Sequence, residues 1–214
     1  MRASPGLVAR RGRLRGQIQA QASDARTLPT GIVTFLLTDI EESTVLLQLL
    51  GDRYAALLAD TRAVIRGCVH RAGGREVDAR ADEFLAVFVR ASGALQAALE
   101  LQRGLRARTW PEGVSVKVRT GIHSGRPTLT DTGYVGLAVH TVARICSAGH
   151  GGQILLSQAA RDALDRSRPP GLRLRGLGSH RFHGLREPLA VVQVESPDLQ
   201  ARFPPLRTLA SPAR

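Results

Sequence analysis

The sequence predicts an α+β domain in which helices pack on an antiparallel-rich sheet. An uninterrupted run of apolar and β-branched residues at 32–38 is typical of a strand that is covered on both faces. Apolar side chains recur at helical spacing over 91–108, which predicts an amphipathic helix with one buried face. The predicted elements follow the order β-αα-β-β-α-β-α-β-α-β, and this order favours a sheet with its helices on one side.

The first half of the domain is punctuated by glycines. Residues 43–71 carry leucine, valine and isoleucine at helical spacing, and the interruption at 51–52 predicts two helices in tandem. A pair of glycines ends the second helix. Residues 75–78 and 83–88 then predict the two arms of a β-hairpin that turns near 79–81.

The second half contains shorter segments. Polar and apolar residues alternate over 114–120, which predicts a half-buried strand that follows a turn at 110–113 and continues to residue 125. A loop rich in glycine and threonine leads to Tyr134-Val135-Gly136, which opens a helix. The remaining predicted elements are helix 137–148, strand 153–157, helix 158–166 and strands 172–177, 180–183 and 190–194.

The composition is that of a soluble globular protein: of 214 residues, 43% are hydrophobic and 22% are charged. No apolar run approaches the roughly 18 residues needed to cross a bilayer, so we expect no membrane span. Arginines at positions 2, 10, 11, 13 and 15 interrupt the N-terminal segment, which excludes a secretory signal. Two cysteines, Cys68 and Cys146, provide no disulfide framework and fit a reducing compartment, so we expect a cytoplasmic protein.

The net charge of +12 is concentrated toward the two ends of the chain. Residues 1–30 contain six arginines and one aspartate without hydrophobic periodicity, so we expect a disordered basic arm. Residues 196–214 contain four prolines, which predicts a loose Pro-rich tail. The 165 residues between them show no dense basic stripe, so we expect one domain at 31–195 and no specific nucleic-acid binding.

Two aspartates lie at the ends of predicted strands. Asp39 follows the buried run at 32–38, and Asp82 precedes the strand at 83–88. If these strands are antiparallel neighbours, both carboxylates lie at one edge of the sheet and can share two magnesium ions with open positions for phosphates. The structural alternative is that Asp39 or Ser43 only caps the helix that begins near residue 43.

Six short segments follow one another along the chain: Thr38-Asp39-Ile40, Ala81-Asp82-Glu83-Phe84, Gly121-Ile122-His123-Ser124-Gly125, Tyr134-Val135-Gly136, Ala143-Arg144-Ile145 and His150-Gly151-Gly152-Gln153-Ile154. In this order and spacing, the chain resembles the catalytic domain of class III adenylate/guanylate cyclases over residues 31–195. The resemblance implies the nucleotide cyclase fold, which is a ferredoxin-like, antiparallel-rich sheet with helices packed on it.

The resemblance also implies roles for individual residues. Asp39 and Asp82 correspond to the aspartates that hold two divalent ions, Mg²⁺ or Mn²⁺, and the Ile40 carbonyl is an expected further ligand. Arg144 corresponds to the arginine that stabilises charge developing on the α-phosphate. The turn that offers backbone amides to the terminal phosphates consists of Glu41, Glu42, Ser43 and Thr44.

Cyclases of this family build their sites across a head-to-tail dimer, with the metal ions held by one chain and the arginine supplied by the other. The resemblance therefore implies a homodimer, or a heterodimer with a second cyclase domain. It also implies a nucleoside triphosphate as the substrate. A single chain should then be inactive.

Several positions depart from the family pattern. Asp78 replaces the purine-reading lysine, and the second base-reading position falls on Gly133. His140 replaces the ribose-orienting asparagine, although it can still donate a hydrogen bond. An ionised Asp78 accepts from an exocyclic amine but cannot donate, so we expect poor discrimination between adenine and guanine. The other departures are Glu42 and Ala81 in place of glycine and His183 in place of a phosphate-binding lysine.

Two interpretations follow. The first is an enzyme, a phosphorus–oxygen lyase that converts ATP, or GTP, to the 3′,5′-cyclic nucleotide and pyrophosphate for intracellular signalling, with activity lowered by the substitutions. The second is a weakly active or inactive cyclase-homology domain that serves as a nucleotide-binding or regulatory dimerisation module. The retained Asp39, Asp82 and Arg144 favour the enzyme, because metals and charge stabilisation supply most of the rate in phosphoryl transfer. The residues that favour the module are Glu42, Asp78, Gly133 and His140.

Overall fold

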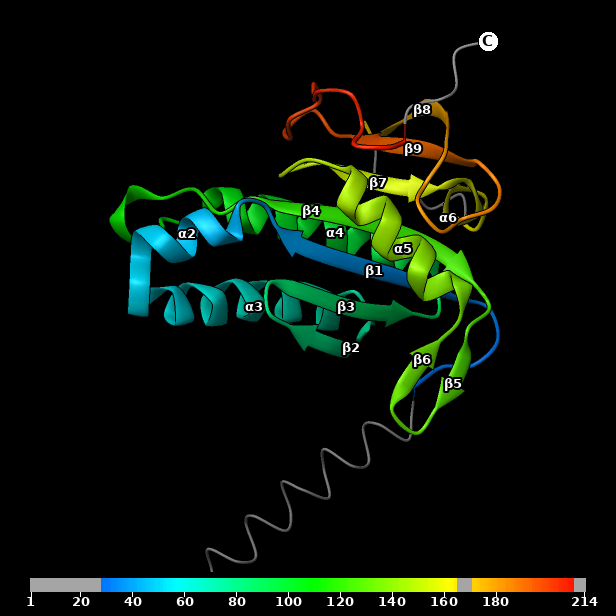
Figure 1. Cartoon of the computed structure of the whole chain (residues 1–214), viewed down its shortest axis with the longest axis horizontal. Helices are drawn as coiled ribbons and strands as arrows, with labels where there is room; N and C mark the ends of the chain where they lie inside the picture. The colour runs from blue at the N-terminus through cyan, green and yellow to red at the C-terminus, as the bar shows by residue number, and fades with distance from the viewer. Residues whose placement is uncertain (1–27, 165–170, 210–214) are drawn as a thin grey trace, which may run out of the picture.

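The computed structural model describes residues 28–164 and 171–209, and the predicted basic arm at 1–30 lies almost wholly outside these residues. The described part is organised around a seven-stranded sheet (Figure 1). Its strands are β1 (Val33–Ile40), β2 (Arg75–Arg80), β3 (Glu83–Phe88), β4 (Val118–Gly125), β7 (Ile154–Ser157), β8 (Arg173–His180) and β9 (Leu189–Glu195). They lie in the order β2-β3-β1-β4-β7-β9-β8, and the pairs are antiparallel except for β4 with β7.

The helices alternate with these strands and confirm the predicted α+β class. The tandem helices are α2 (Ser43–Leu50) and α3 (Tyr54–Arg71), joined by the 3₁₀ turn η1 (Gly51–Arg53). The last predicted helix ends at Asp162, short of the predicted 166, and residues 165 and 166 lie outside the described ones. The remaining helices are α4 (Ala91–Ala107), the 3₁₀ turn η2 (Pro111–Gly113), α5 (Leu137–Ala148) and α6 (Gln158–Asp162).

The helices cover both faces of the sheet. Every residue of β1 is buried. Leu36 and Ile40 lie in the core formed with α3 and α4, whereas Phe35 and Leu37 pack with residues of α5. In Figure 1, α5 crosses in front of the sheet and α4 lies behind it. The predicted one-sided packing is wrong, because a central strand that is apolar on both faces needs cover on both.

The predicted start of the fourth strand is also wrong. β4 begins at Val118 and not at residue 114, because its pairing with β1 starts where Val118 faces Ile40, the last residue of β1. Val116 is nevertheless buried in the core. An alternating pattern therefore reports which side chains are buried and does not report whether a neighbouring strand is available for pairing.

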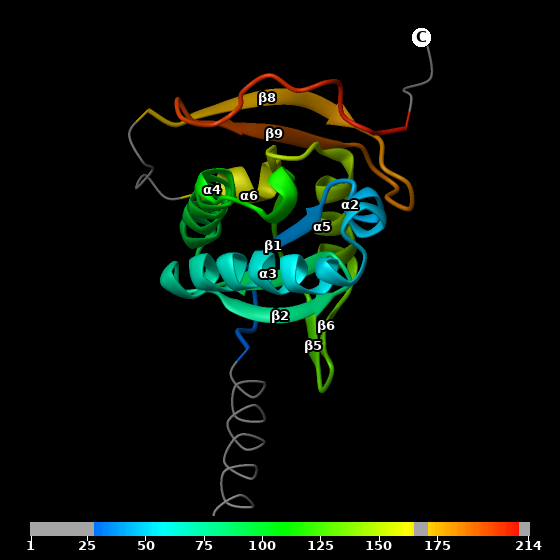
Figure 2. The same cartoon turned by 90° about the vertical axis from the view of Figure 1, so that its left-hand side faces the viewer.

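Two further segments differ from prediction. The strands predicted at 172–177 and 180–183 form the single strand β8, which passes through a register shift near Gly176. The loop predicted before α5 contains a small hairpin, β5 (Thr128–Thr130) and β6 (Gly133–Val135). Figures 1 and 2 both show this hairpin projecting from the body of the domain.

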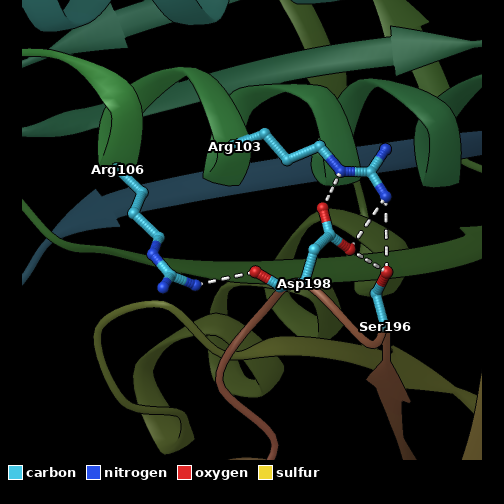
Figure 3. Close-up of polar contacts among 4 residues, drawn as sticks. All are labelled: Arg103, Arg106, Ser196 and Asp198. Carbon is cyan, nitrogen blue, oxygen red and sulfur yellow. Dashed lines mark hydrogen bonds and ion pairs between the residues drawn. The ribbon is translucent and has the colours of Figure 1, made fainter.

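Residues 196–209 lie against the domain, although their composition predicts a loose tail; Figure 3 shows the contacts of Ser196 and Asp198 with α4, and Leu209 forms a bridge with Arg181. Arg103 on α4 donates to the Asp198 carboxylate at 2.6 and 3.1 Å, and Arg106 donates to the Asp198 carbonyl at 2.7 Å. Farther along, the Arg207 amide donates to the Ala148 carbonyl at 2.9 Å. Prolines remove only their own N–H donors, so donors from other elements still hold the carbonyls of this segment.

The backbone of α5 lies close to β4 at Gly121. A Cβ atom on Gly121 would lie 2.7 Å from the Cys146 amide nitrogen and 2.9 Å from the Val142 carbonyl oxygen. Both are backbone atoms of α5, so they cannot move unless the helix moves. Because α5 also carries Arg144, the absence of a side chain at Gly121 sets the distance of Arg144 from the sheet.

We expect Gly121→Ala to lower the free energy of unfolding by about 1–3 kcal/mol, because overpacking separates α5 from β4. Gly176→Ala is the matched control, since a Cβ atom at Gly176 meets nothing within 4 Å. Urea unfolding of both variants measures the difference. Equal stability of the two variants would contradict this account of the helix–strand contact.

Candidate active site

The carboxyl groups of Asp39 and Asp82 meet at one edge of the sheet. Asp39 is the penultimate residue of β1 and faces Glu83, the first residue of β3. Asp82 lies in the turn just before β3, and its carboxyl group lies close enough to Asp39 to raise the pKa of that residue. The juxtaposition predicted from the two strand ends is therefore present.

Neither Asp39 nor Ser43 caps α2. The N-cap residue is Glu42, and its side chain makes no capping hydrogen bond. The Ser43 hydroxyl instead lies near the phenol of Tyr54 on α3 and opposes the rise in the pKa of that group. The structural alternative, in which Asp39 or Ser43 only serves the helix start, is wrong.

Both turns beside the carboxyl pair contain a strained residue. Glu42 has φ 57° and Ala81 has φ 45°, which is the left-handed region that favours glycine. A side chain in this region costs about 1 kcal/mol relative to the right-handed conformation. The resemblance to class III cyclases implies glycine at these two positions. The turns therefore keep a backbone conformation typical of glycine although glycine is absent.

Arg119 on β4 forms an ion pair with Asp39, and the two residues face each other in the β1–β4 register. Their side chains are only 19% and 12% exposed. Burial raises the pKa of Asp39 to about 6; the Arg119 charge opposes this rise, whereas Asp82 adds to it. The buried Nε of Arg119 has no hydrogen-bond partner within the described residues. The site thus holds two neighbouring carboxyl groups, one of them with a raised pKa, and a guanidinium whose Nε donor is unpaired.

The acid pair fits a divalent cation. A cation bound between the two carboxyl groups would offset the repulsion between their negative charges. Ile40, whose carbonyl is the expected further ligand, ends β1 with its side chain buried. Across the described ranges, no group of three or more His, Cys, Asp or Glu side chains could hold a metal. Carbonyl, water or phosphate oxygens would therefore complete the coordination, which is the pattern of an open site.

Three residues beside the pair were not predicted from the sequence: Arg119, Arg62 and Tyr54. Arg62 on α3 donates to the Ala81 carbonyl at 2.6 Å and so supports the turn that presents Asp82. Burial raises the pKa of Tyr54, and the charge of Asp82 adds to the rise. The β1–β4 register would have identified Arg119, whereas no spacing in the sequence connects α3 with this turn.

The turn at Glu41–Thr44 is held at its first residue. The Glu41 amide donates to the Lys117 carbonyl at 2.9 Å, and its carboxylate accepts from Arg207 at 3.1 Å. Glu42 and Thr44 are exposed. The predicted phosphate turn therefore has one anchored end and an accessible middle.

Arg144 and His140 lie one helical turn apart, and both are exposed on α5. Buried Val142 and Ile145 hold the opposite face of the helix in the core. Within the described chain, no hydrogen bond or ion pair joins Arg144 or His140 to the aspartate pair. One chain alone does not bring the predicted arginine into contact with the predicted metal ligands.

The two predicted base-reading positions lie near each other. Asp78 is on β2, and its carboxylate pairs with Arg80 at 2.8 Å. Gly133 begins β6, and a Cβ atom built on it would lie 3.8 Å from the side chain of Val77, the residue before Asp78. The β5–β6 hairpin therefore brings Gly133 beside β2.

Known proteins resemble this chain over most of its length. An uncharacterized protein of Mycobacterium tuberculosis is 38% identical over 189 residues, and the match spans 87% of this chain and 64% of that protein. The adenylate cyclase of Lachancea kluyveri is 27% identical over 71% of this chain and 10% of its own length. No protein-family model matches the chain.

Solved structures identify the family. An adenylate cyclase of Trypanosoma brucei in its monomeric state has a TM-score of 0.74 and 27% identity, covering 86% of this chain and 97% of that chain. The adenylate/guanylate cyclase/hydrolase of Silicibacter pomeroyi has a TM-score of 0.66 and 26% identity, covering 80% and 99%. The chain belongs to the class III adenylate/guanylate cyclase family. The predicted cyclase fold is confirmed, and no helix in the described part of this cyclase domain is long and apolar enough to cross a membrane.

The stability of this cyclase domain should fall as pH rises from about 4 to about 6 through the Asp39 carboxyl group. The pKa of Asp39 is about 6 in the fold against an ordinary 3.8, so the folded chain keeps a proton that the unfolded chain loses. Asp39→Asn has no such group. We expect the stability of the variant relative to the parent to rise by about 2 kcal/mol across this window in EDTA.

Urea unfolding at pH 4, 5, 6 and 7 measures this difference, and groups common to both proteins cancel. A difference that stays flat across the series would contradict the desolvated carboxyl group. At pH 7, Mn²⁺ should stabilise the parent and not the variant, because the acid pair is the expected cation ligand.

Proposed function

We propose that this cyclase domain converts ATP, or GTP, to the 3′,5′-cyclic nucleotide and pyrophosphate. The observation that carries the proposal is the desolvated Asp39 carboxyl group beside Asp82 and Arg119. It combines anionic oxygens for cations with a guanidinium for phosphate at the end of one strand. Similarity to proteins named as adenylate cyclases supports the same reaction.

Asp39 and Asp82, with the Ile40 carbonyl, are the residues that would hold two divalent cations, Mg²⁺ or Mn²⁺. Cations bound there supply acidity to the ribose 3′-hydroxyl and neutralise charge on the triphosphate. The chain positions the two carboxyl groups and limits their contact with water. Arg62 holds the turn before Asp82, and burial of Asp39 keeps water from competing for its carboxylate.

Phosphate binding follows from the groups around the pair. When Asp39 no longer needs Arg119 as its partner, the guanidinium becomes available to a phosphate oxygen, and its Nε is already unpaired. The exposed middle of the Glu41–Thr44 turn can offer backbone amides to the terminal phosphates. The positive charge of Arg207 offsets the negative charge of the Glu41 carboxylate, which would otherwise repel the terminal phosphates.

Cyclisation joins the ribose 3′-oxygen to the α-phosphorus and breaks the bond from that phosphorus to the leaving pyrophosphate. Negative charge grows on the α-phosphate oxygens, and a positioned guanidinium stabilises it. Arg144 has the positive charge to stabilise the α-phosphate, and His140 can form a hydrogen bond with the ribose. Because neither contacts the acid pair of its own chain, we propose that both act across a head-to-tail homodimer or a pairing with a second cyclase domain.

The second candidate function is a nucleotide-binding or regulatory dimerisation module with little turnover. Two observations favour it. The Asp78 carboxylate in the base-reading position is already paired with Arg80, and Glu42 places a negative charge on the phosphate turn. Both substitutions weaken substrate recognition and leave the acid pair and Arg144 intact.

We expect the parent protein to form cyclic nucleotide from ATP with Mn²⁺. Asp39→Ala and Arg144→Ala should each lower kcat at least about a hundredfold, as loss of one charge-stabilising group does. Chromatographic separation of the cyclic product measures the rate. Arg161→Ala is the matched control, because Arg161 is an exposed arginine on α6, outside the proposed site.

A mixture of the two inactive variants tests the shared site. Equal amounts of Asp39→Ala and Arg144→Ala should recover up to about a quarter of parent activity, because half of the dimers then hold one intact site. Dimers that form without recovery would refute the head-to-tail arrangement. Thermal stabilisation of the parent by nucleotide without any product would favour the module.

We expect kcat/KM for ATP and GTP to agree within about tenfold, because an ionised Asp78 cannot donate to guanine O6 or adenine N1. Asp78→Lys supplies a donor and should separate the two values. Steady-state kinetics of both proteins with both triphosphates measures the effect. A sharp preference for one base in the parent would contradict the assignment of Asp78 as the base-reading residue.

A further inference from the structure

A groove of about 700 Å³ lies apart from the acid pair. It is bounded by the C-terminal turn of α4, residues 114–117 and residues 197–200, and neither Asp39 nor Asp82 lines it. The volume falls within the range of small-molecule sites in proteins. The groove is therefore large enough to hold a ligand that the cyclase reaction does not account for.

Among the charged side chains that line the groove, cations outnumber carboxylates. Arg106, Arg108 and Lys117 contribute to it, against the single carboxylate of Asp198. Arg103 reaches Asp198 from α4 and holds the pKa of its carboxyl group below the ordinary value (Figure 3). The carboxylate is thus already neutralised, and the groove keeps a net positive charge.

Two of the three cations are not compensated by a carboxylate. Arg108 pairs with Asp60 at 2.6 Å and lies over the ring of Trp110. Arg106 donates only to the neutral Asp198 carbonyl, as Figure 3 shows. Lys117, the single lysine of the chain, is exposed and has no hydrogen bond or ion pair from its side chain to any described residue. Arg106 and Lys117 come from different walls of the groove.

We propose that this groove binds a small phosphate-bearing anion between Arg106 and Lys117. A guanidinium and an ammonium group from two walls match the several oxygens of a phosphate group, and charge-assisted hydrogen bonds are the strong ones. Ser115 and Gln200 in the lining add neutral donors. The site is additional to the proposed triphosphate site and does not depend on it.

The groove shares a wall with the phosphate turn. The Lys117 carbonyl accepts from the Glu41 amide at 2.9 Å. Gly151, which also lines the groove, leaves room for the Glu41 carboxylate: a Cβ atom on Gly151 would lie 2.4 Å from its Oε2. An anion bound between Arg106 and Lys117 therefore lies behind the turn that would hold the substrate phosphates.

Isothermal titration calorimetry of the whole chain with inorganic pyrophosphate in EDTA tests the proposal. Without divalent cations the acid pair cannot hold a metal–phosphate complex, so the result is independent of cyclase activity. We expect saturable binding at one site. Lys117→Gln should weaken it at least about tenfold, and Arg106→Gln should weaken it similarly, whereas Lys117→Arg should retain it.

Arg161→Gln removes the same charge from α6, outside the groove, and should leave the Kd unchanged. Because the Lys117 side chain is exposed and makes no contact that the fold needs, Lys117→Gln should unfold at the parent temperature. Absence of binding in the parent would overturn the proposal. So would equal weakening by Lys117→Gln and Arg161→Gln, or binding of an oligonucleotide without binding of pyrophosphate.

Discussion

The desolvation of one carboxyl group at the end of the central strand constrains the rest of the site. β1 is covered on both faces, so its penultimate residue, Asp39, cannot reach bulk water as a surface aspartate does. An unpaired ionised group in that position would be costly. The charge of Arg119 offsets that of Asp39, whereas the neighbouring carboxyl group of Asp82 raises the pKa of Asp39 further. In the proposed function, a divalent cation would bind the carboxyl groups of Asp39 and Asp82, and a phosphate group would bind the guanidinium of Arg119.

Strain in the two turns that flank Asp39 and Asp82 also supports a functional site at this end of the sheet. Glu42 and Ala81 hold left-handed backbone conformations that glycine would adopt without a side-chain penalty. Stability alone would favour glycine in both positions or a different turn. The conformations persist because the surrounding contacts determine them: Arg62 holds the Ala81 carbonyl, and the Lys117 carbonyl holds the amide just before Glu42. The backbone conformations of these two residues are ones that their side chains disfavour, and such strained positions concentrate at functional sites.

The sequence predicted those features that depend on neighbouring residues. The periodicity of α3 and α4 and the apolar run of β1 determine these elements, and the strand ends place Asp39 near Asp82. Features that depend on distant partners were not predictable. The contact of Arg119 with Asp39 needs the β1–β4 register, and the contact of Asp198 with Arg103 spans 95 residues of chain. The apolar run of β1 already indicated cover on both faces, whereas the order of the elements, which favoured helices on one side, did not show on which face each helix packs.

The exposed face of α5 indicates how a second chain would complete the proposed active site. Leu137, His140 and Arg144 are spaced three and four residues apart, so they share one face of the helix. All three are exposed, and Leu137 is exposed by 68%. An apolar side chain left in water beside a histidine and an arginine gains nothing in a lone chain, whereas a second chain would cover the leucine and receive the charged groups. The chain that buries most of Asp39 thus leaves its proposed phosphate-stabilising arginine exposed. That asymmetry is the physical reason to seek activity in the assembled pair and not in the single chain.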